Sequence, residues 1–288
     1  MSPSTILITG AAGRMGSMLR ARLARPGRVL RLVDVLPLPE TAGPAGGAAA
    51  PGDPAEVSLT ASVTDLAAMT AACAGADAVI HLGGIPTEDA WGPILDVNIN
   101  GAYTVFEAAR RAAVRRVVFA SSNHAVGFAP RASFPVPDDA RPDPDTYYGV
   151  SKAAGEALAA LYANRYGLET ICVRILTCAD RPENPRSLAT WLSPDDAGRL
   201  FEACLTAPAP GFRVIYGVSA NTRGNWVSLD GARALGYQPR DDAEAYAAEV
   251  LGGGEPDLAD PVFRYLGGEF TLPSRDAPLP PLGSRPPD

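Results

Sequence analysis

The sequence predicts a protein of the α/β class, built on a doubly wound parallel sheet. Three observations lead to this prediction. Short runs of Val, Ile and Leu are apolar throughout, segments with helical periodicity separate them, and a glycine-rich turn at 9–16 links the first run to the first helix. Strands that are buried on both faces have this uniform apolar character, and they occur in parallel sheets that helices cover on both sides.

The expected strands are short, and they follow one another through the first two thirds of the chain. They are the runs 6–8, 29–33, 57–59, 78–82, 116–120 and 171–175, of which 57–59 is the weakest. Helices are expected over about 14–24 and 146–166. A later helix should begin at Ser193, because a serine cap, a proline in the first turn and two acidic residues favour a helix N-terminus.

The composition is that of a globular protein, with 47% hydrophobic and 20% charged residues. The 25 basic and 32 acidic residues give a net charge of −7, which argues against a nucleic-acid partner and against docking on an anionic membrane. No apolar run reaches the roughly 18 residues of a membrane span, and the N-terminus lacks the features of a signal peptide. We therefore expect a cytoplasmic protein.

Metal and redox chemistry are not expected. The four cysteines include no CxxC pair, and the chain has only two histidines. Zinc sites and dithiol redox centres need clusters of these residues at short spacing. The prediction is a reduced protein without a metal site.

The glycine-rich turn after the first strand has the spacing of a dinucleotide-binding motif. Gly10 allows a tight turn, Gly13 lets the backbone approach a pyrophosphate, and Gly16 allows helix and strand to pack closely. The N–H groups of the helix N-terminus then face the phosphates. Asp34 ends the second strand, 21 positions after Gly13, where a carboxylate binds the adenosine ribose and repels a 2′-phosphate. The turn predicts NAD rather than NADP, although Arg14 is a cation that could favour NADP.

A catalytic pair is predicted on the helix 146–166. Tyr148 and Lys152 lie four residues apart, so that both side chains face the same way. An ammonium group favours a nearby phenolate, so we expect Lys152 to lower the pKa of Tyr148 from its usual value of about 10. Ser121 and Ser122 follow the fifth strand, at the edge of the sheet where ligands bind, and a hydroxyl there can orient a substrate oxygen.

These motifs together resemble the extended short-chain dehydrogenase/reductase superfamily over residues 4 to about 250. They read TGAAGRMG at 9–16, HLGG at 81–84, NINGAY at 98–103, SSNH at 121–124 and YGVSK at 148–152. More narrowly, the chain resembles the NAD-dependent uronate dehydrogenases. The segments HLGGI at 81–85, FASSNHAVG at 119–127, TYYGVSKAAGE at 146–156, ATW at 189–191, SPDDAG at 193–198 and YGVSAN at 216–221 carry this narrower resemblance.

The resemblance implies roles for individual residues. The implied catalytic residues are Ser122, Tyr148, Lys152 and Asn98, of which Asn98 holds a relay water. The implied cofactor-binding residues are Gly10, Ala12, Gly13, Arg14, Met15, Gly16, Asp34, Ser62, Leu82, Gly83, Gly84 and Lys152. The implied substrate-binding residues are Ser122, Asn123, His124, Tyr148, Thr177 and Arg186, with no metal ligand among them.

Some of these positions depart from the family pattern or allow a second interpretation. Ser62 stands where the superfamily usually has an aspartate near the adenine, and Thr177 replaces a serine near the sugar. Arg186 matches an arginine that clasps a substrate carboxylate, and the alternative for it is a solvated surface position. His81 ends a buried strand, where we expect a structural rather than a catalytic histidine.

The activity that the resemblance implies is oxidation of the C1 hydroxyl of a cyclic hexuronic acid, galacturonate or glucuronate, to an aldarolactone, with hydride transfer to NAD. Two alternatives remain open at this point. One is a nucleotide-sugar epimerase or dehydratase on the same scaffold, which would hold NAD without exchanging it. The other is a non-catalytic NAD-sensing protein, although such proteins commonly lose the Tyr–Lys pair.

The expected organisation has three parts. Residues 1–176 form an NAD-binding core of Rossmann type that includes the catalytic helix. Residues 177–272 form a small substrate-binding region interleaved with it, and the Pro-rich tail 273–288 is expected to be disordered. Residues 41–54 are almost all Ala, Gly and Pro, and we expect them to form a mobile surface loop. The expected partners are the small-molecule uronate and further copies of the chain in a homo-oligomer.

Overall fold

The computed structural model describes residues 4–38 and 55–272. Within these residues, seven parallel strands form one sheet in the order β3-β2-β1-β4-β5-β6-β9. The strands are β1 (Thr5–Thr9), β2 (Val29–Asp34), β3 (Ala55–Thr60), β4 (Ala78–His81), β5 (Arg116–Ser122), β6 (Glu169–Ile175) and β9 (Phe212–Gly217). The predicted loop 41–54 and the predicted tail 273–288 lie outside the described residues.

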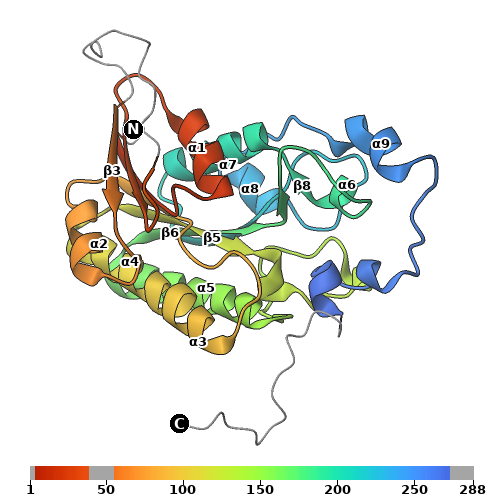
Figure 1. Ribbon diagram of the computed structural model, residues 1–288, viewed down its shortest axis with the longest axis horizontal. Coiled ribbons are helices and arrows are strands. Elements are labelled where there is room, and N and C mark those ends of the chain that lie inside the picture. The colour runs from red at the N-terminus through yellow and green to blue at the C-terminus, as the bar shows by residue number, and fades with distance from the viewer. Residues whose placement is uncertain (1–3, 39–54, 273–288) are drawn as a thin grey trace, which may run out of the picture.

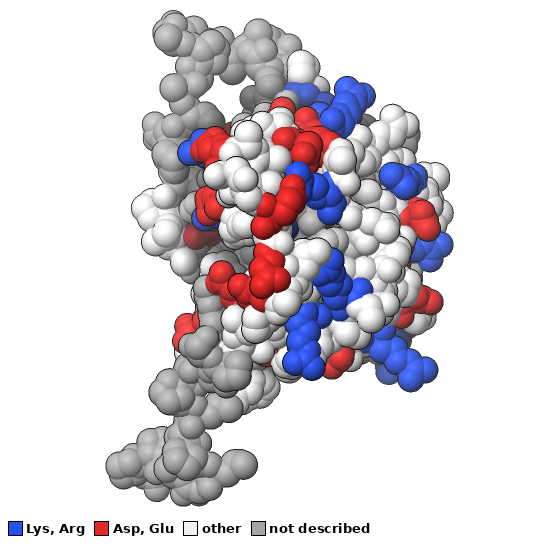
Figure 2. Space-filling model, turned by 90° about the vertical axis from the view of Figure 1, so that its right-hand side faces the viewer, with Lys and Arg blue, Asp and Glu red and all other residues white. Residues whose placement is uncertain are grey.

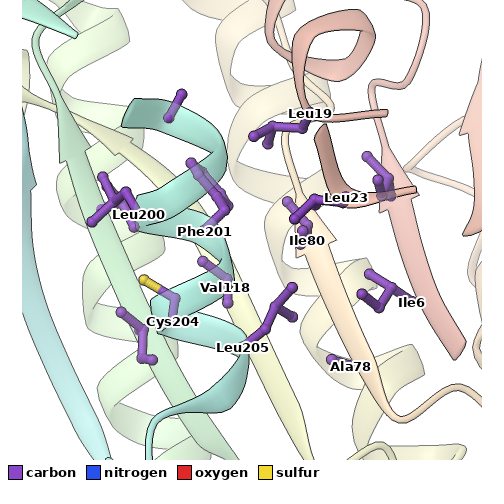
Figure 3. Close-up of a cluster of buried hydrophobic side chains, with 14 of the residues drawn as sticks. Ile6, Leu19, Leu23, Ala78, Ile80, Val118, Leu200, Phe201, Cys204 and Leu205 are labelled. Atoms are coloured by element: carbon purple, nitrogen blue, oxygen red, sulfur yellow. The ribbon is translucent and has the colours of Figure 1, made fainter. Parts of the chain in front are cut away.

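Helices cover both faces of the sheet, as the sequence predicts (Figure 1). One face carries α1 (Arg14–Leu23), α7 (Pro194–Thr206) and α8 (Asp230–Ala234), and the other carries α2 (Leu66–Cys73), α4 (Asn100–Arg111) and α5 (Tyr147–Tyr166). Each face has its own continuous core of buried side chains. In Figure 3, Leu200, Phe201, Cys204 and Leu205 of α7 lie on the sheet beside Leu19 and Leu23 of α1. This core is the hydrophobic contact that fixes the position of α1, and with it the glycine-rich turn.

The predicted elements are present with small shifts in their ends. The helix predicted at 14–24 is α1, and the one predicted at 146–166 is α5, which begins after the Thr146 cap and ends at Gly167 in the left-handed conformation. The predicted start of α7 is also confirmed, because Ser193 Oγ accepts a hydrogen bond of 2.8 Å from the Asp196 backbone N–H. All six predicted strands lie in the sheet.

The seventh strand, β9, is not among the predicted elements. It pairs in parallel with β6 along the whole of Phe212–Gly217. Its first residues are partly exposed because it lies at the edge of the sheet, so Arg213 interrupts the uniformly apolar pattern of the other strands. A second, smaller sheet pairs β7 (Thr177–Cys178) with β8 (Trp191–Leu192) beyond the carboxyl end of β6.

Short elements fill the region around the carboxyl edge of the sheet. They are α3 (Trp91–Pro93), a π-helical turn η1 (Ile94–Ile99), η2 (Asn123–Val126), η3 (Arg131–Ser133), α6 (Ser187–Thr190), η4 (Ala243–Tyr246), α9 (Ala247–Leu251), η5 (Pro261–Phe263) and η6 (Gly268–Thr271). The strand order reverses at β1, between β2 and β4, so loops diverge there and leave a crevice for a ligand.

The surface is of mixed charge. Figure 2 shows basic and acidic side chains interspersed over the face that lies at the right of Figure 1. Over residues 4–38 and 55–272, no helix is long and apolar enough to span a membrane. The same residues contain no cluster of three or more His, Cys, Asp or Glu that could hold a metal ion.

Candidate active site

A cavity of about 910 Å³ runs along the carboxyl edge of the sheet, from Asp34 at the end of β2 to Tyr148 on α5. This size is in the range of ligand-binding pockets. It crosses the point where the strand order reverses, where doubly wound folds bind ligands. The predicted cofactor-binding residues that line it are Gly10, Ala12, Gly13, Arg14, Met15, Gly16, Asp34, Ser62, Leu82, Gly83, Gly84 and Lys152.

The glycine-rich turn brings backbone rather than side chains to this cavity. Gly10 has a φ of +70°, and a Cβ there would lie 2.8 Å from the Gly83 nitrogen. A Cβ at Gly16 would lie 2.3 Å from the Gly10 oxygen, so only glycine allows α1 to pack this closely on the turn. Gly13 caps α1 without a side-chain partner, and no acidic residue lies in the first turn. The free N–H groups and the positive end of the helix dipole therefore face the cavity and fit a pyrophosphate.

Asp34 is held in place at the ribose end of the cavity. Its Oδ2 accepts a hydrogen bond of 2.9 Å from the Ala12 backbone N–H, and its Oδ1 accepts one of 3.1 Å from that of Leu36. Each carboxylate oxygen has two lone pairs, so both can still accept from a ribose hydroxyl. Ser62 Oγ lies 2.8 Å from Thr64 Oγ1 near this end. The donor and acceptor set fits the adenosine half of NAD.

Tyr148, Lys152 and Ser122 meet at the other end of the cavity, as predicted. Lys152 Nζ donates to the Ala120 backbone oxygen at 2.9 Å and lies 5.3 Å from the centre of the Tyr148 ring. Ser122 Oγ donates to Asn123 Oδ1 at 3.4 Å, and it lies close enough to Tyr148 to lower the pKa of the phenol by hydrogen bonding. The neighbouring Ser121 is already engaged, because its Oγ donates to Glu156 Oε1 at 2.6 Å. Ser122 is thus the serine that can hold a substrate oxygen.

The protonation of this group differs from the prediction. We expected Lys152 to lower the pKa of Tyr148, but burial raises that pKa to about 12, against the lowering effect of the Ser122 hydrogen bond. Burial also lowers the pKa of Lys152 to about 8. Both shifts have one cause, since a site closed to water penalises the charged form of each group. The tyrosine is therefore a neutral phenol in the site as it stands.

Two side chains that the sequence analysis did not single out fix the N-terminus of α5. The Glu88 carboxylate accepts backbone N–H bonds from Tyr147 at 3.2 Å and from Tyr148 at 2.7 Å. Ser151 Oγ donates to the Tyr148 backbone oxygen at 2.7 Å and accepts from Asn98 Nδ2 at 3.2 Å. No local sequence pattern identifies Glu88, because it lies 60 positions before the tyrosine it holds.

Asn98 lies on the π-helical turn η1 and links α5 to the loop after β4. Its Oδ1 accepts from the Ile85 backbone N–H at 2.7 Å, and its Nδ2 donates to the Ile85 oxygen at 3.0 Å. These bonds hold the loop that forms one wall of the cavity. The relay water that the resemblance implies for Asn98 stays a prediction.

A second cavity of about 600 Å³ opens beside Tyr148 and shares Arg14, Asn123, His124, Leu176 and Cys178 with the first. Thr177 and Arg186 line it, so all six predicted substrate-binding residues lie around the two adjoining cavities. Thr177 Oγ1 lies 2.9 Å from Thr190 Oγ1. His81, in contrast, is fully buried with its Nδ1 2.8 Å from Thr9 Oγ1, which confirms a structural role.

Arg186 is a partly buried cation that lines the second cavity, and not a fully solvated surface residue. Its guanidinium donates to the Leu266 oxygen and lies 5.5 Å from the centre of the Trp226 ring. Its Nε is buried and has no hydrogen-bond partner in the described part of the chain. Burial lowers the pKa of Arg186 to about 10, against the opposing effects of Asp145 and Glu269. An unpaired buried donor is costly, so this group is poised to bind an acceptor.

Asn123 and His124 follow Ser122 on the turn η2, between the two cavities. Asn123 Nδ2 donates to the Leu266 oxygen at 3.1 Å, the same oxygen that Arg186 contacts. The His124 ring lies against Phe270, with ring centres 4.2 Å apart. The segment around 266–270 thus closes the second cavity. The sequence analysis did not identify Phe270, because nothing near it in the chain carries a motif.

The chain matches the model of the NAD dependent epimerase/dehydratase family over residues 6–186. It is 42% identical to a uronate dehydrogenase of Pseudomonas putida over 93% of this chain and 95% of that protein. It also resembles two crystal structures: one of glucuronic acid dehydrogenase from Chromohalobacter salexigens, and one of a uronate dehydrogenase mutant from Agrobacterium tumefaciens complexed with NAD. The first is 39% identical, with a TM-score of 0.83 over 93% of this chain and 97% of that one. The second is 41% identical, with a TM-score of 0.82 and the same coverage of both chains.

The fold, the cofactor cavity and the Tyr–Lys pair agree with these likenesses. The predicted superfamily and the predicted cofactor NAD are confirmed. With a family model that covers more than half of its length and relatives above 40% identity, the chain belongs to the NAD-dependent epimerase/dehydratase family.

Proposed function

We propose that the protein is an NAD-dependent uronate dehydrogenase. It oxidises the C1 hydroxyl of a cyclic hexuronic acid, galacturonate or glucuronate. C1 loses a hydride and its hydroxyl loses a proton, so the direct product is an aldarolactone, which water can open to the aldarate. NAD, when bound, supplies the hydride acceptor.

The observation that carries this proposal is the partly buried guanidinium of Arg186 in a cavity that adjoins Tyr148, because its Nε has no hydrogen-bond partner among the described residues. A uronate differs from a neutral hexose by its carboxylate, so a selective site needs a cation at that end of the sugar. A guanidinium has a planar set of donors that matches a carboxylate. Arg186 holds the carboxylate end and leaves C1 to reach Ser122 and Tyr148.

The phenolate form of Tyr148 accepts the proton of the C1 hydroxyl, and Ser122 holds the same oxygen in place. Since burial disfavours the phenolate, the groups that stabilise it decide the rate. The hydrogen bond from Ser122 lowers the pKa of Tyr148, and the charge of Lys152 lies 5.3 Å from its ring. Glu88 and Ser151 fix the helix that carries both side chains. General-base catalysis of this kind contributes about 10²–10⁴-fold.

The region from 177 to 272 contributes Thr177, Arg186 and Phe270 to the second cavity, which supports assigning it to the substrate and residues 1–176 to NAD. We also propose that the enzyme is cytoplasmic and forms a homo-oligomer. Tyr103 on α4 and Leu161 and Tyr166 on α5 are about half exposed, at 47%, 48% and 48%, and support an apolar contact there. Sedimentation at micromolar concentration tests the oligomer, and a monomer would contradict it.

The test of the function is NADH formation with the purified protein against three sets of compounds: galacturonate and glucuronate, the neutral sugars galactose and glucose, and nucleotide sugars. Turnover of the uronates by a wide margin over the other two sets is the expected result. Turnover of nucleotide sugars with NAD that stays bound after purification would instead assign an epimerase or dehydratase. NAD binding without turnover of any of them would assign a non-catalytic role.

A further inference from the structure

A buried carboxylate that none of the motifs includes lies directly behind the substrate site. The side chain of Asp145 is 0% exposed. Its Oδ2 lies 2.7 Å from His124 Nδ1, and its Oδ1 accepts a hydrogen bond of 3.0 Å from Thr146 Oγ1. Thr146 Oγ1 in turn accepts from the Gly149 backbone N–H and so caps α5. Since Thr146 caps the helix, Asp145 acts on the histidine, and its charge also favours the charged form of Arg186.

Three glycines make room for this carboxylate. A Cβ at Gly127 would lie 2.0 Å from Asp145 Oδ2, one at Gly267 would lie 1.9 Å from it, and one at Gly149 would lie 3.1 Å from Oδ1. A side chain at Gly127 or at Gly267 would displace the carboxylate. The three glycines come from distant parts of the chain and converge on one group, which indicates a built site rather than a chance contact.

The partner atoms fix the state of the His124 ring. An ionised carboxylate only accepts hydrogen bonds, so the proton of the neutral imidazole lies on Nδ1 and the lone pair on Nε2. Phe270 and Tyr148 contact the ring at centre-to-centre distances of 4.2 and 5.9 Å and limit its rotation. Nε2 has no partner within residues 4–38 and 55–272, and His124 lines both cavities.

We propose that Asp145 is a positioning residue, which holds His124 in the Nδ1–H form so that Nε2 accepts a hydrogen bond from a ring hydroxyl of the sugar. This inference rests on the proposed function. It adds a second selectivity element to the same cavity: Arg186 recognises the carboxylate, and the Asp145–His124 pair requires a hydroxyl. A site built to bind a hydroxyl rejects an analogue that lacks it, because its buried polar atom is then unpaired.

The first experiment reads the histidine directly, without catalysis. The chain has only two histidines, so a ¹⁵N-histidine-labelled sample gives two sets of ring signals. His81 is an internal reference, because its Nδ1 is paired with Thr9 Oγ1 and not with Asp145. His124→Gln assigns the signals.

With the wild-type protein at a pH where both rings are neutral, His124 should show the Nδ1–H form. Asp145→Asn should shift the His124 population toward Nε2–H and leave the His81 signals unchanged, and Asp145→Ala should do so if the Asn variant does not fold. A His124 signal that stays in the Nδ1–H form in the variants, or a wild-type ring in the Nε2–H form, would overturn the inference.

The second experiment is a kinetic double-mutant cycle of Asp145→Asn and His124→Ala with glucuronate. A hydrogen bond present in both the bound and the transition state affects KM more than kcat. We expect KM to rise roughly ten- to a hundredfold in each single variant, with kcat within a few-fold and the NAD dissociation constant unchanged. In the His124→Ala background, Asp145→Asn should add no more than about twofold, as expected for residues that act as one unit.

Asp143→Asn is the matched control, since it removes the same charge from an exposed residue two positions away. An unchanged KM in Asp145→Asn, or an equal loss with and without His124, would contradict the inference. A fall in kcat alone would also do so, because it would indicate a displaced Tyr148. If the wild-type protein turns over no uronate, the proposed function fails, and the tautomer measurement alone decides whether Asp145 positions His124.

Discussion

The two cavities that meet at Tyr148 are built in different ways. The cofactor cavity is lined largely by glycines and backbone: the glycine-rich turn, the N-terminus of α1 and the glycines after β4 lie within short contiguous segments. The second cavity, which we propose for the substrate, is lined by side chains from residues 123–124, 177–186 and 256–270. Ser122, Tyr148 and Lys152 lie where the two cavities meet, and we assign the chemical step to them.

This difference explains how one fold can serve many substrates. A backbone site depends on glycine positions and strand ends, which the sheet itself fixes. A side-chain site can change its ligand when single residues change and the fold stays the same. Substitutions in the two cavities should therefore have different effects. Those in the cofactor cavity should change NAD binding whatever the substrate, and those in the substrate cavity should leave NAD binding unchanged.

The largest effect is expected where the cavities meet. Tyr148→Phe removes the oxygen that accepts the substrate proton and should lower kcat by about 10²–10⁴-fold with NAD binding retained. Steady-state NADH formation and NAD titration measure the two quantities. Tyr147→Phe is the matched control, since the neighbouring ring contacts Trp91 at the surface and should keep its activity. Near-normal turnover in Tyr148→Phe would remove the tyrosine from the mechanism.

The second effect is on stability and follows from burial of Lys152. Burial lowers the pKa of Lys152 to about 8 from a usual 10.5. Between these two pH values the unfolded chain therefore binds more protons at Lys152 than the folded chain does. The free energy of unfolding consequently increases as the pH rises from 8 to 10.5. Below pH 8 the buried Lys152 is charged, and this lowers the free energy of unfolding by roughly 2–4 kcal/mol. Lys152→Met should thus raise Tm at pH 7, by an amount that shrinks toward pH 10.5.

Lys152 is the single lysine of the chain, so its titration can be followed without overlap. A ¹³C-lysine-labelled sample should give one side-chain signal with a midpoint near pH 8. A midpoint of 10 or above, together with an unchanged Tm in Lys152→Met, would show that the ammonium is solvated and that the site is open to water.

A smaller effect is expected in the cofactor cavity. Asp34→Asn keeps an acceptor for the Ala12 N–H but removes the charge that repels a 2′-phosphate. The ratio of kcat/KM for NAD to that for NADP should fall by about tenfold or more, with the KM for glucuronate unchanged. If the wild-type protein already uses NADP as well as NAD, Arg14 outweighs Asp34 and the assignment of this carboxylate is wrong.

The smallest effect concerns the clamp on α5. Glu88→Gln keeps the shape but removes a charge from the helix N-terminus and weakens two backbone contacts. The free energy of unfolding should fall by about 1 kcal/mol, measured by urea denaturation. Asp96→Asn, at an exposed position nearby, is the control. An equal fall in the free energy of unfolding in both variants would show that Glu88 acts only through its charge and not through its hydrogen bonds to α5.

The same contrast between backbone and side-chain sites decides how much the sequence could predict. The glycine spacing, Asp34 and the pair Tyr148–Lys152 lie in local patterns, so the cofactor cavity and its neighbour were predictable. The edge strand β9 was not, because partial exposure breaks its apolar pattern. Glu88, Asp145 and Phe270 act through contacts with distant segments, and no short spacing encodes them. The pKa of Tyr148 was predicted in the wrong direction, since burial is not visible in a motif.

The central claim is that Arg186 recognises the uronate carboxylate beside a generic NAD site. Its most direct test is the ratio of kcat/KM for glucuronate to that for glucose, in the wild-type protein and in Arg186→Ala. A lost charged hydrogen bond should lower this ratio about ten- to a hundredfold, through KM for glucuronate, with glucose turnover and NAD binding nearly unchanged. Arg186→Lys should recover part of the loss. A ratio that stays at the wild-type value in Arg186→Ala would contradict the account and place recognition of the carboxylate elsewhere.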